Sequence, residues 1–169
     1  MYRSVVALPS QLAKTVISIC YLGYFTRAPG TIGSLVTVIF WLIFSHYFYF
    51  IDPRLIAAVM SLVGLILGWI SLSIYFREKP DATEKNWNDP SWVIIDEWAG
   101  MSIALISVTG AYFLDAALLF FLFRVFDIWK PGFIGTAQNI PGAIGVLLDD
   151  VLAGILAGLV YWFFKLILI

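Results

Sequence analysis

Two adjacent acids, Asp149 and Asp150, lie within residues 131–164, a stretch that is otherwise uncharged and mostly apolar. A carboxylate in such surroundings costs several kcal/mol unless a cation partners it. A second acidic pair, Asp96 and Glu97, opens another apolar stretch. We therefore expect these acids to gather around a cation at one polar site.

A third charged segment adds bases, because Arg124, Asp127 and Lys130 are spaced three residues apart and share roughly one helical face. If all groups are ionised, the six acids and three bases of the expected site leave it short of about three positive charges. These residues are Asp89, Asp96, Glu97, Asp127, Asp149, Asp150, Arg27, Arg124 and Lys130. Hard oxygen ligands in excess favour Mg²⁺, and the lack of His and Cys argues against zinc. The predicted metal ligands are Asp96, Glu97, Asp127, Asp149 and Asp150.

Helix geometry limits how these acids can act together. Neighbouring residues on a helix point about 100° apart, so Asp149 and Asp150 cannot both aim at one point. One of them is expected to bind a metal, and the other a second metal or a basic partner. The same reasoning applies to Asp96 and Glu97.

The bases point to a phosphate ligand. Arg124 suits a phosphate through two parallel N–H groups, and Lys130 acts as a point charge. Residues 26–34 form a Pro- and Gly-containing helix start, where Arg27, Thr31 and free N–H groups suit an anion. Metal, carboxylates and bases together favour phosphoryl chemistry, with a carboxylate acting on water or attacking phosphorus itself. The structural alternatives are ion pairs that fix helix packing and an ordinary helix cap.

Composition places the chain in a membrane. Of its 169 residues, 62% are hydrophobic and only 12% are charged, and the mean hydropathy is +0.94. A soluble domain of this size could not bury so much apolar surface, so the chain is expected to be an integral membrane protein. A net charge of −1 gives no reason to expect a nucleic-acid partner, and the lone Cys20 excludes an internal disulfide.

The apolar segments predict an all-α, polytopic membrane helix bundle that forms one domain over residues 1–169. An N-terminal interfacial helix is expected over residues 9–25. Residues 77–92 and 131–142 are expected to be loops. About five transmembrane helices are expected, over residues 28–51, 55–76, 93–109, 112–130 and 143–168.

Charge asymmetry orients this arrangement, because cytoplasmic loops carry an excess of Lys and Arg. If the N-terminus is cytoplasmic, the only basic residues on the opposite side of the membrane are Arg54 and Lys165. The cytoplasmic side then receives eight basic residues: Arg3, Lys14, Arg27, Arg77, Lys79, Lys85, Arg124 and Lys130. The same orientation brings all the acids and bases of the expected site to the cytoplasmic face.

Four segments resemble the bacterial phosphatidylglycerophosphatase A family, and together they run over most of the chain. They are Ala28-Pro29-Gly30-Thr31-Ile32-Gly33-Ser34-Leu35, residues 89–101 with Asp96-Glu97-Trp98-Ala99-Gly100, residues 123–131 with the pattern Arg-x-x-Asp-x-x-Lys-Pro, and residues 145–154 with Asp149-Asp150. Each segment alone is moderately specific, whereas all four in this order and spacing are highly specific.

The resemblance implies a Mg²⁺-dependent phosphatase of the bacterial cytoplasmic membrane. It implies the substrate phosphatidylglycerophosphate and the products phosphatidylglycerol and phosphate. The family's metal-binding or catalytic acids would correspond to Asp96, Glu97, Asp149 and Asp150. Its basic segment would correspond to Arg124, Asp127, Lys130 and Pro131.

Two other functions are compatible with an acidic membrane site. A metal-dependent lipid phosphotransferase would need a nucleotide or alcohol co-substrate, for which the sequence offers no dedicated site. A divalent-cation transporter or channel would need acids near mid-bilayer along a path that reaches both faces. The far side offers only Asp52 and Asp115, which favours the phosphatase. The sequence carries no sign of an oligomeric state.

Overall fold

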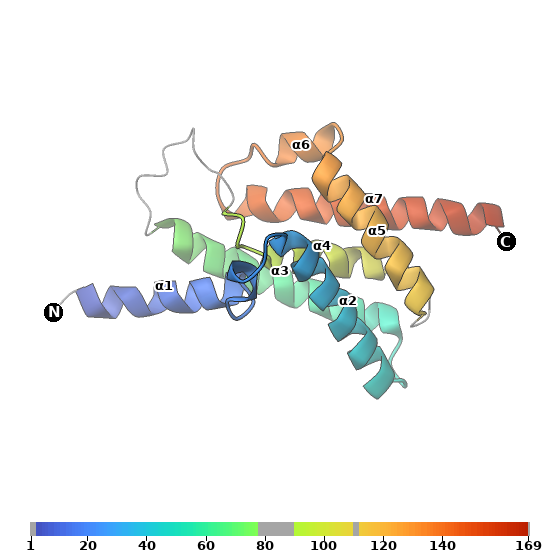
Figure 1. The fold of residues 1–169 in the computed structure, drawn as a ribbon, viewed down its shortest axis with the longest axis horizontal. Coiled ribbons are helices and arrows are strands. Elements are labelled where there is room, and N and C mark those ends of the chain that lie inside the picture. The colour runs from blue at the N-terminus through green and yellow to red at the C-terminus, as the bar shows by residue number, and fades with distance from the viewer. Residues whose placement is uncertain (1–2, 78–89, 110–111, 169) are drawn as a thin grey trace.

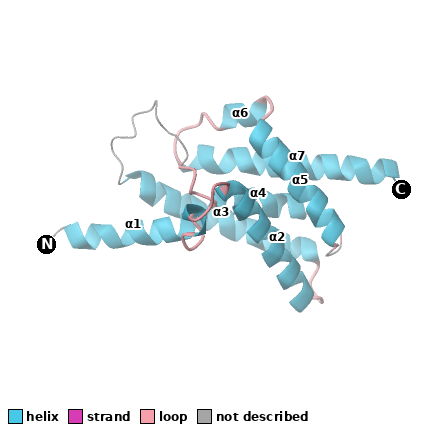
Figure 2. Ribbon diagram, viewed as in Figure 1, coloured by secondary structure: helices cyan, strands magenta, loops and turns pink. Residues whose placement is uncertain are grey.

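A computed structural model describes residues 3–77, 90–109 and 112–168, and the regular elements in these ranges are all helices (Figures 1 and 2). The expected all-α fold is thus confirmed for this part of the chain. In order, the α-helices are α1 (Arg3–Ile17), α2 (Pro29–Tyr47), α3 (Pro53–Arg77), α4 (Ile95–Leu105), α5 (Phe113–Trp129), α6 (Phe133–Ala137) and α7 (Ala143–Leu168), and a 3₁₀ turn, η1 (Leu22–Tyr24), follows α1.

Within the described ranges, three helices are long and apolar enough to cross a membrane: α2, α3 and α7. Proline occupies the first position of both α2 and α3, where its missing N–H costs no hydrogen bond. At the turn between them, Asp52 Oδ1 accepts a hydrogen bond of 2.8 Å from the Arg54 backbone N–H. These helices agree with three of the five expected spans.

The helix α4 is much shorter than the span expected over residues 93–109. Its 11 residues rise about 16 Å, roughly half of a hydrocarbon core of about 30 Å. It packs against α2, α3, α5 and α7, and Ala99, Met101 and Leu105 are fully buried. The helix α5 has 17 residues, at the lower end of the range for a span. The count of five spans and the cytoplasmic N-terminus therefore stay predictions.

The largest apolar core is formed where α4 packs against the longer helices α2, α3, α5 and α7. Its largest fully buried side chains include Trp41 of α2, Leu105 of α4 and Phe123 of α5. The Trp41 indole N–H donates a hydrogen bond of 2.9 Å to the Pro53 carbonyl, which ties the end of α2 to the start of α3. This core fixes the ends of the helices that carry the charged residues.

The N-terminal helix differs from its expected bounds of 9–25. The helix α1 begins at Arg3, before Pro9, and ends at Ile17. It ends there because the following residues Ile19, Cys20 and Tyr21 adopt left-handed backbone angles, with φ of 46°, 56° and 65°. It packs against α3, and the Ile94 N–H donates a hydrogen bond of 2.9 Å to the Ile17 carbonyl. The end of α1 therefore supports the segment that leads into α4, while its interfacial placement stays a prediction.

Glycines bring the backbones of α4 and α7 into direct contact. A Cβ on Gly100 would lie 2.4 Å from the Asp150 carbonyl oxygen, and one on Gly154 would lie 2.2 Å from the Gly100 carbonyl oxygen. Small residues allow such close approach between membrane helices. The approach places Asp150 of α7 beside the first turns of α4.

Gly100→Ala is expected to lower the free energy of unfolding by about 1–3 kcal/mol, because the new methyl group meets backbone atoms that cannot rotate away. The measurement is the midpoint of thermal unfolding of the detergent-purified protein. Ile155→Ala, at an exposed position of α7, is the matched control and should change the midpoint little. Equal midpoints for Gly100→Ala and wild type would refute the close packing of α4 on α7.

Candidate functional site

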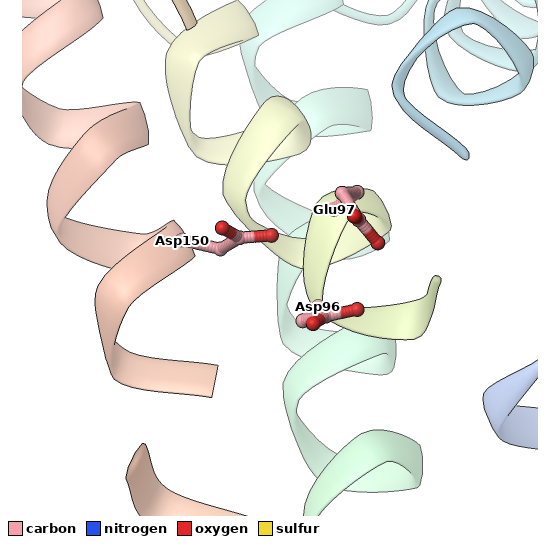
Figure 3. Close-up of side chains that lie close together, drawn as sticks. All are labelled: Asp96, Glu97 and Asp150. Atoms are coloured by element: carbon pink, nitrogen blue, oxygen red, sulfur yellow. The ribbon is translucent and has the colours of Figure 1, made fainter. Parts of the chain in front are cut away.

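Three carboxylates from two helices form one group. Asp96 and Glu97 occupy the first turn of α4, and Asp150 reaches toward them from α7 (Figure 3). Each offers an oxygen atom, and these three atoms all lie within 4.8 Å of one another. Asp96 and Asp150 are only 3% and 2% exposed, so water cannot solvate their charges fully. We refer to Asp96, Glu97 and Asp150 as the carboxylate triad.

The triad fits a divalent cation. Asp96 Oδ1 and Asp150 Oδ2 are buried without a hydrogen-bond partner among the described residues. Oxygens on opposite sides of a Mg²⁺ ion lie about 4.2 Å apart, and the three triad oxygens lie within 4.8 Å of one another. Carboxylate oxygens are also the ligands that Mg²⁺ prefers. Buried acidic oxygens without partners at this spacing are what a cation site requires.

Asp149 faces a different partner from its neighbour Asp150. The Lys130 ammonium donates a hydrogen bond to Asp149 Oδ2 and forms an ion pair with it. The divergence of the two aspartates follows the prediction from helix geometry, and Asp149 has the basic partner that was one of the two expected outcomes. Its role as a metal ligand stays a prediction.

The corresponding prediction for Asp96 and Glu97 was wrong in that both offer an oxygen to the triad, although Glu97 also has the expected basic partner, Arg124, at 4.0 Å. The Glu97 side chain is one methylene longer than that of Asp96. Its carboxylate can therefore reach back to the same place, although the two Cβ atoms point in different directions. The 100° rule holds for the first side-chain bond and not for the end of a longer chain.

Lys130 is positioned by the end of α5. It adopts a left-handed conformation with φ 46° and ψ 58°, and its N–H donates to the Phe126 carbonyl, which ends the helix. Gly132 also has a positive φ of 46°, and α6 follows at once. The expected loop over residues 131–142 thus contains one short helix. This turn holds the Lys130 side chain beside α7.

Arg124 lies between Asp127 and the triad. Its Nη1 atom is 2.6 Å from Asp127 Oδ2 and 4.0 Å from Glu97 Oε1, and its side chain is only 15% exposed. The ion pair of Arg124 with Asp127, which the sequence offered as a structural alternative, is therefore present. A metal-binding role for Asp127 stays a prediction.

Gly30 allows the first turn of α2 to approach this pair. A Cβ there would lie 2.3 Å from Glu97 Oε1 and 2.9 Å from Arg124 Nη1. The first turns of α2 and α4 therefore meet the C-terminal part of α5 at the triad. Sequence reasoning placed Gly30 in a helix-start motif but did not predict this contact, nor the contact of Gly100 with Asp150. The only available signal was a glycine at the start of a helix near predicted site residues.

Two residues that were predicted to bind phosphate, Arg27 and Thr31, lie near the start of α2. Arg27 is exposed just before α2, and Thr31 is half-buried in its first turn. Neither forms an ion pair or side-chain hydrogen bond with another described residue. Asp89 lies outside the described residues. The roles of Arg27 and Thr31 in binding phosphate stay predictions.

The charges that come together are unbalanced. Five acids, namely Asp96, Glu97, Asp127, Asp149 and Asp150, meet two bases, Arg124 and Lys130. If all are ionised, these seven side chains carry a net charge of about −3. Such an excess in buried surroundings is costly unless cations neutralise it. Arg124 pairs with Asp127 and Lys130 pairs with Asp149, and Arg124 is also 4.0 Å from Glu97 of the triad.

Helices long and apolar enough to cross a membrane thus occur together with a buried acidic site that is flanked by two bases. Residues 15–165 match the phosphatidylglycerophosphatase A family. The chain belongs to this family, and it is an enzyme of the phosphatase class. The resemblance noted in the sequence is thereby confirmed.

Individual relatives agree on phosphatase chemistry but differ in the named lipid. The chain is 31% identical to phosphatidylglycerophosphatase A of Escherichia coli, over 79% of this chain and 73% of the relative. It is 30% identical to phosphatidylglycerophosphatase A of Haemophilus influenzae, over 83% of each. It is 35% identical to a protein of Bacteroides thetaiotaomicron that is provisionally named a phosphatidylinositol-3-phosphatase, over 79% of this chain and 80% of the relative. No solved structure matches the chain.

Proposed function

We propose that this enzyme hydrolyses phosphatidylglycerophosphate to phosphatidylglycerol and phosphate, with Mg²⁺ as cofactor, at the cytoplasmic face of the bacterial inner membrane. The observation that carries the proposal is the buried carboxylate triad beside Arg124 and Lys130, in a chain of this family. In the reaction, water supplies the oxygen that becomes part of phosphate. The bond between phosphorus and the terminal glycerol oxygen breaks, and that oxygen takes up a proton from the water to become a hydroxyl.

Asp96, Glu97 and Asp150 would hold the Mg²⁺ ion. When bound, the ion supplies positive charge that stabilises the phosphate oxygens. Asp127 and Asp149 border the triad, and each already has a basic partner. We therefore assign them to the orientation of Arg124 and Lys130 in this proposal.

Arg124 and Lys130 bind the phosphate. The Arg124 guanidinium is fixed by Asp127, and its Nε atom is buried without a hydrogen-bond partner among the described residues. Lys130 is held by Asp149 but keeps a side chain that is 26% exposed, so its remaining N–H groups can reach a ligand. The Arg124 guanidinium and the Lys130 ammonium stabilise the negative charge that develops on the phosphate oxygens in the transition state. This stabilisation lowers the activation free energy of hydrolysis.

The surface beside Lys130 favours a lipid over a soluble phosphate ester. Ile128 and Trp129 are each 72% exposed, and Phe133 on α6 is also exposed. Apolar side chains next to a phosphate-binding base suit a substrate whose acyl chains stay in the bilayer while its head group enters the site. This arrangement supports a membrane lipid as the substrate class.

Ion pairs on the far side argue against transport. Asp52 and Arg54 lie 2.6 Å apart, and hydrogen bonds from Arg54 lower the pKa of the Asp52 carboxyl below its usual value. Asp115 and Lys165 lie 2.9 Å apart. A cation path would need acids that are free to bind the ion on that side. The acids there are already neutralised, which favours hydrolysis over transport.

The substrate assignment is tested by phosphate release from detergent-purified protein with Mg²⁺. Phosphatidylglycerophosphate, phosphatidylinositol 3-phosphate and phosphatidic acid are compared at equal concentration in mixed micelles. We expect the largest kcat/KM for phosphatidylglycerophosphate, by at least about tenfold. Faster hydrolysis of phosphatidylinositol 3-phosphate would mean that this lipid, which appears in the name of the Bacteroides relative, is the preferred substrate.

Arg124→Ala is expected to raise KM and lower kcat, with a loss in kcat/KM of about a hundredfold, because a charge-assisted phosphate contact disappears. Initial rates over a range of phosphatidylglycerophosphate concentrations separate the two effects. His46→Ala is the matched control, since His46 is exposed on α2, in the last turn and away from the triad. If Arg124→Ala changed only the unfolding temperature, Arg124 would be a packing residue.

A further inference from the structure

A pocket with several polar side chains in its lining lies at the end of α7 that is far from the carboxylate triad. It has a volume of about 310 Å³ and is lined by Ser107, Thr109, Tyr161, Trp162, Lys165 and Leu166. Lys165 lies 15 positions beyond Asp150 on α7, a rise of about 22 Å along the helix. The pocket is therefore separate from the carboxylate triad, and nothing in the proposed hydrolysis uses it.

The short α4 explains why the pocket exists. This helix ends at Leu105, whereas α7 continues to Leu168. The turn after α4 places Ser107 against α7, where a Cβ on Gly158 would lie 2.3 Å from Ser107 Oγ. Beyond that contact no further turn of α4 covers Tyr161 and Lys165. The space that a longer α4 would fill is left between the turn and α7.

The pocket carries charged and hydroxyl groups in an apolar setting. Lys165 Nζ lies 2.9 Å from Asp115 Oδ1 on α5 and 5.6 Å from the centre of the Tyr161 ring. Tyr161 is 3% exposed, and its side chain interacts with both Asp115 and Lys165. The Lys165 side chain is nevertheless 44% exposed. An ammonium has three donors, so Lys165 can bind Asp115 and an outside acceptor together.

We propose that this pocket binds the phosphodiester head group of a phospholipid in the leaflet opposite the carboxylate triad. Lys165 donates to the phosphate, and the Ser107 and Thr109 hydroxyls complete the polar surroundings. Exposed apolar side chains of α7, Leu159 and Phe163, lie within two turns of Lys165 and provide a surface for acyl chains. Trp162 in the lining has the amphipathic ring that is typical of head-group depth.

The other far-side ion pair shows what a purely structural pair looks like. Asp52 and Arg54 belong to a single turn, and their side chains are 35% and 48% exposed. Asp115 and Lys165 instead join two helices, and Lys165 lines a pocket with two hydroxyl residues. Joining α5 to α7 does not require such a pocket. The space beside Lys165 therefore leaves room for a ligand with a phosphate group.

The test is native mass spectrometry of the full-length, detergent-purified protein after titration with palmitoyl-oleoyl phosphatidylethanolamine or phosphatidylglycerol. Dioleoylglycerol, which has no phosphate, is the third arm. We expect one phospholipid per chain at low lipid concentration. Lys165→Gln should bind it about tenfold more weakly, since a charge-assisted contact is lost. Arg54→Gln is the matched control and should bind as wild type.

A double variant guards against misfolding, because Lys165→Gln leaves Asp115 unpaired. Asp115→Asn/Lys165→Gln removes both charges and should show the same tenfold loss with an unfolding temperature near that of wild type. Phosphate release by both variants should stay within about threefold of wild type, since neither residue touches the triad. Equal lipid binding by the double variant and wild type, or equally tight binding of dioleoylglycerol, would overturn the proposal. These outcomes do not depend on which lipid the enzyme hydrolyses.

Discussion

Replacing Asp150 with asparagine is expected to abolish divalent-cation binding and phosphatase activity together. Asp150 is 2% exposed, and one of its oxygens is buried without a hydrogen-bond partner among the described residues. Asparagine keeps the shape but removes the charge that attracts a cation. We expect Mn²⁺ affinity to fall at least about a hundredfold and kcat at least about a thousandfold, or about 4 kcal/mol in the barrier. Electron paramagnetic resonance of Mn²⁺ titrated into the purified protein measures the affinity.

The matched control is the neighbouring acid. Asp149→Asn removes the same charge one residue earlier on α7, but Asp149 is engaged by Lys130 and lies outside the triad. Its Mn²⁺ affinity should stay within about threefold of wild type, because the triad is unchanged. If Asp149→Asn lost Mn²⁺ as completely as Asp150→Asn, the assignment of the cation to Asp96, Glu97 and Asp150 would be wrong.

Asp149→Asn is nevertheless expected to lower kcat by about a hundredfold, because Lys130 loses the partner that orients its ammonium. Lys130→Met should cause a loss of similar size, since it removes the positive charge at the same place. The measurement is the rate of phosphate release at saturating phosphatidylglycerophosphate and Mg²⁺.

The double variant Asp149→Asn/Lys130→Met tests whether these two residues act as a unit. Residues in one ion pair show non-additive effects, so the double variant should be no more than about threefold slower than either single variant. Multiplied losses, of about ten-thousandfold, would mean that Asp149 and Lys130 contribute separately. In that case Asp149 would act on the substrate or the cation directly.

Much of the helical arrangement was predictable from the sequence. Long uncharged stretches bounded by Pro29, Pro53 and Arg77 marked α2 and α3, and the apolar run after Gly142 marked α7. The early end of α4 was not predictable, because the apolar pattern continues through Ile106 and Val108 without a glycine or proline. The end of α1 was also not predictable from the sequence, because Ile19, Cys20 and Tyr21 adopt left-handed backbone angles that such residues rarely adopt.

The site was predictable at the level of residue types. Helix periodicity correctly separated the directions of Asp149 and Asp150, and the spacing of Arg124 and Asp127 predicted their shared face. The pairing of Asp149 with Lys130 and the grouping of Asp150 with Asp96 and Glu97 depended on packing between different helices. The contacts of Gly30 with Glu97 and of Gly100 with Asp150 decide which oxygens meet, and one-dimensional periodicity carries no information about them.

The most direct test of the proposed reaction is phosphate release from phosphatidylglycerophosphate by the purified protein, with Mg²⁺ and with EDTA, beside Asp150→Asn. A folded sample of each protein is first verified by its unfolding temperature. We predict release by wild type with Mg²⁺, almost none with EDTA, and almost none by Asp150→Asn under either condition. Release that persists in EDTA, or in Asp150→Asn with Mg²⁺, would contradict a cation-dependent phosphatase site built on the carboxylate triad.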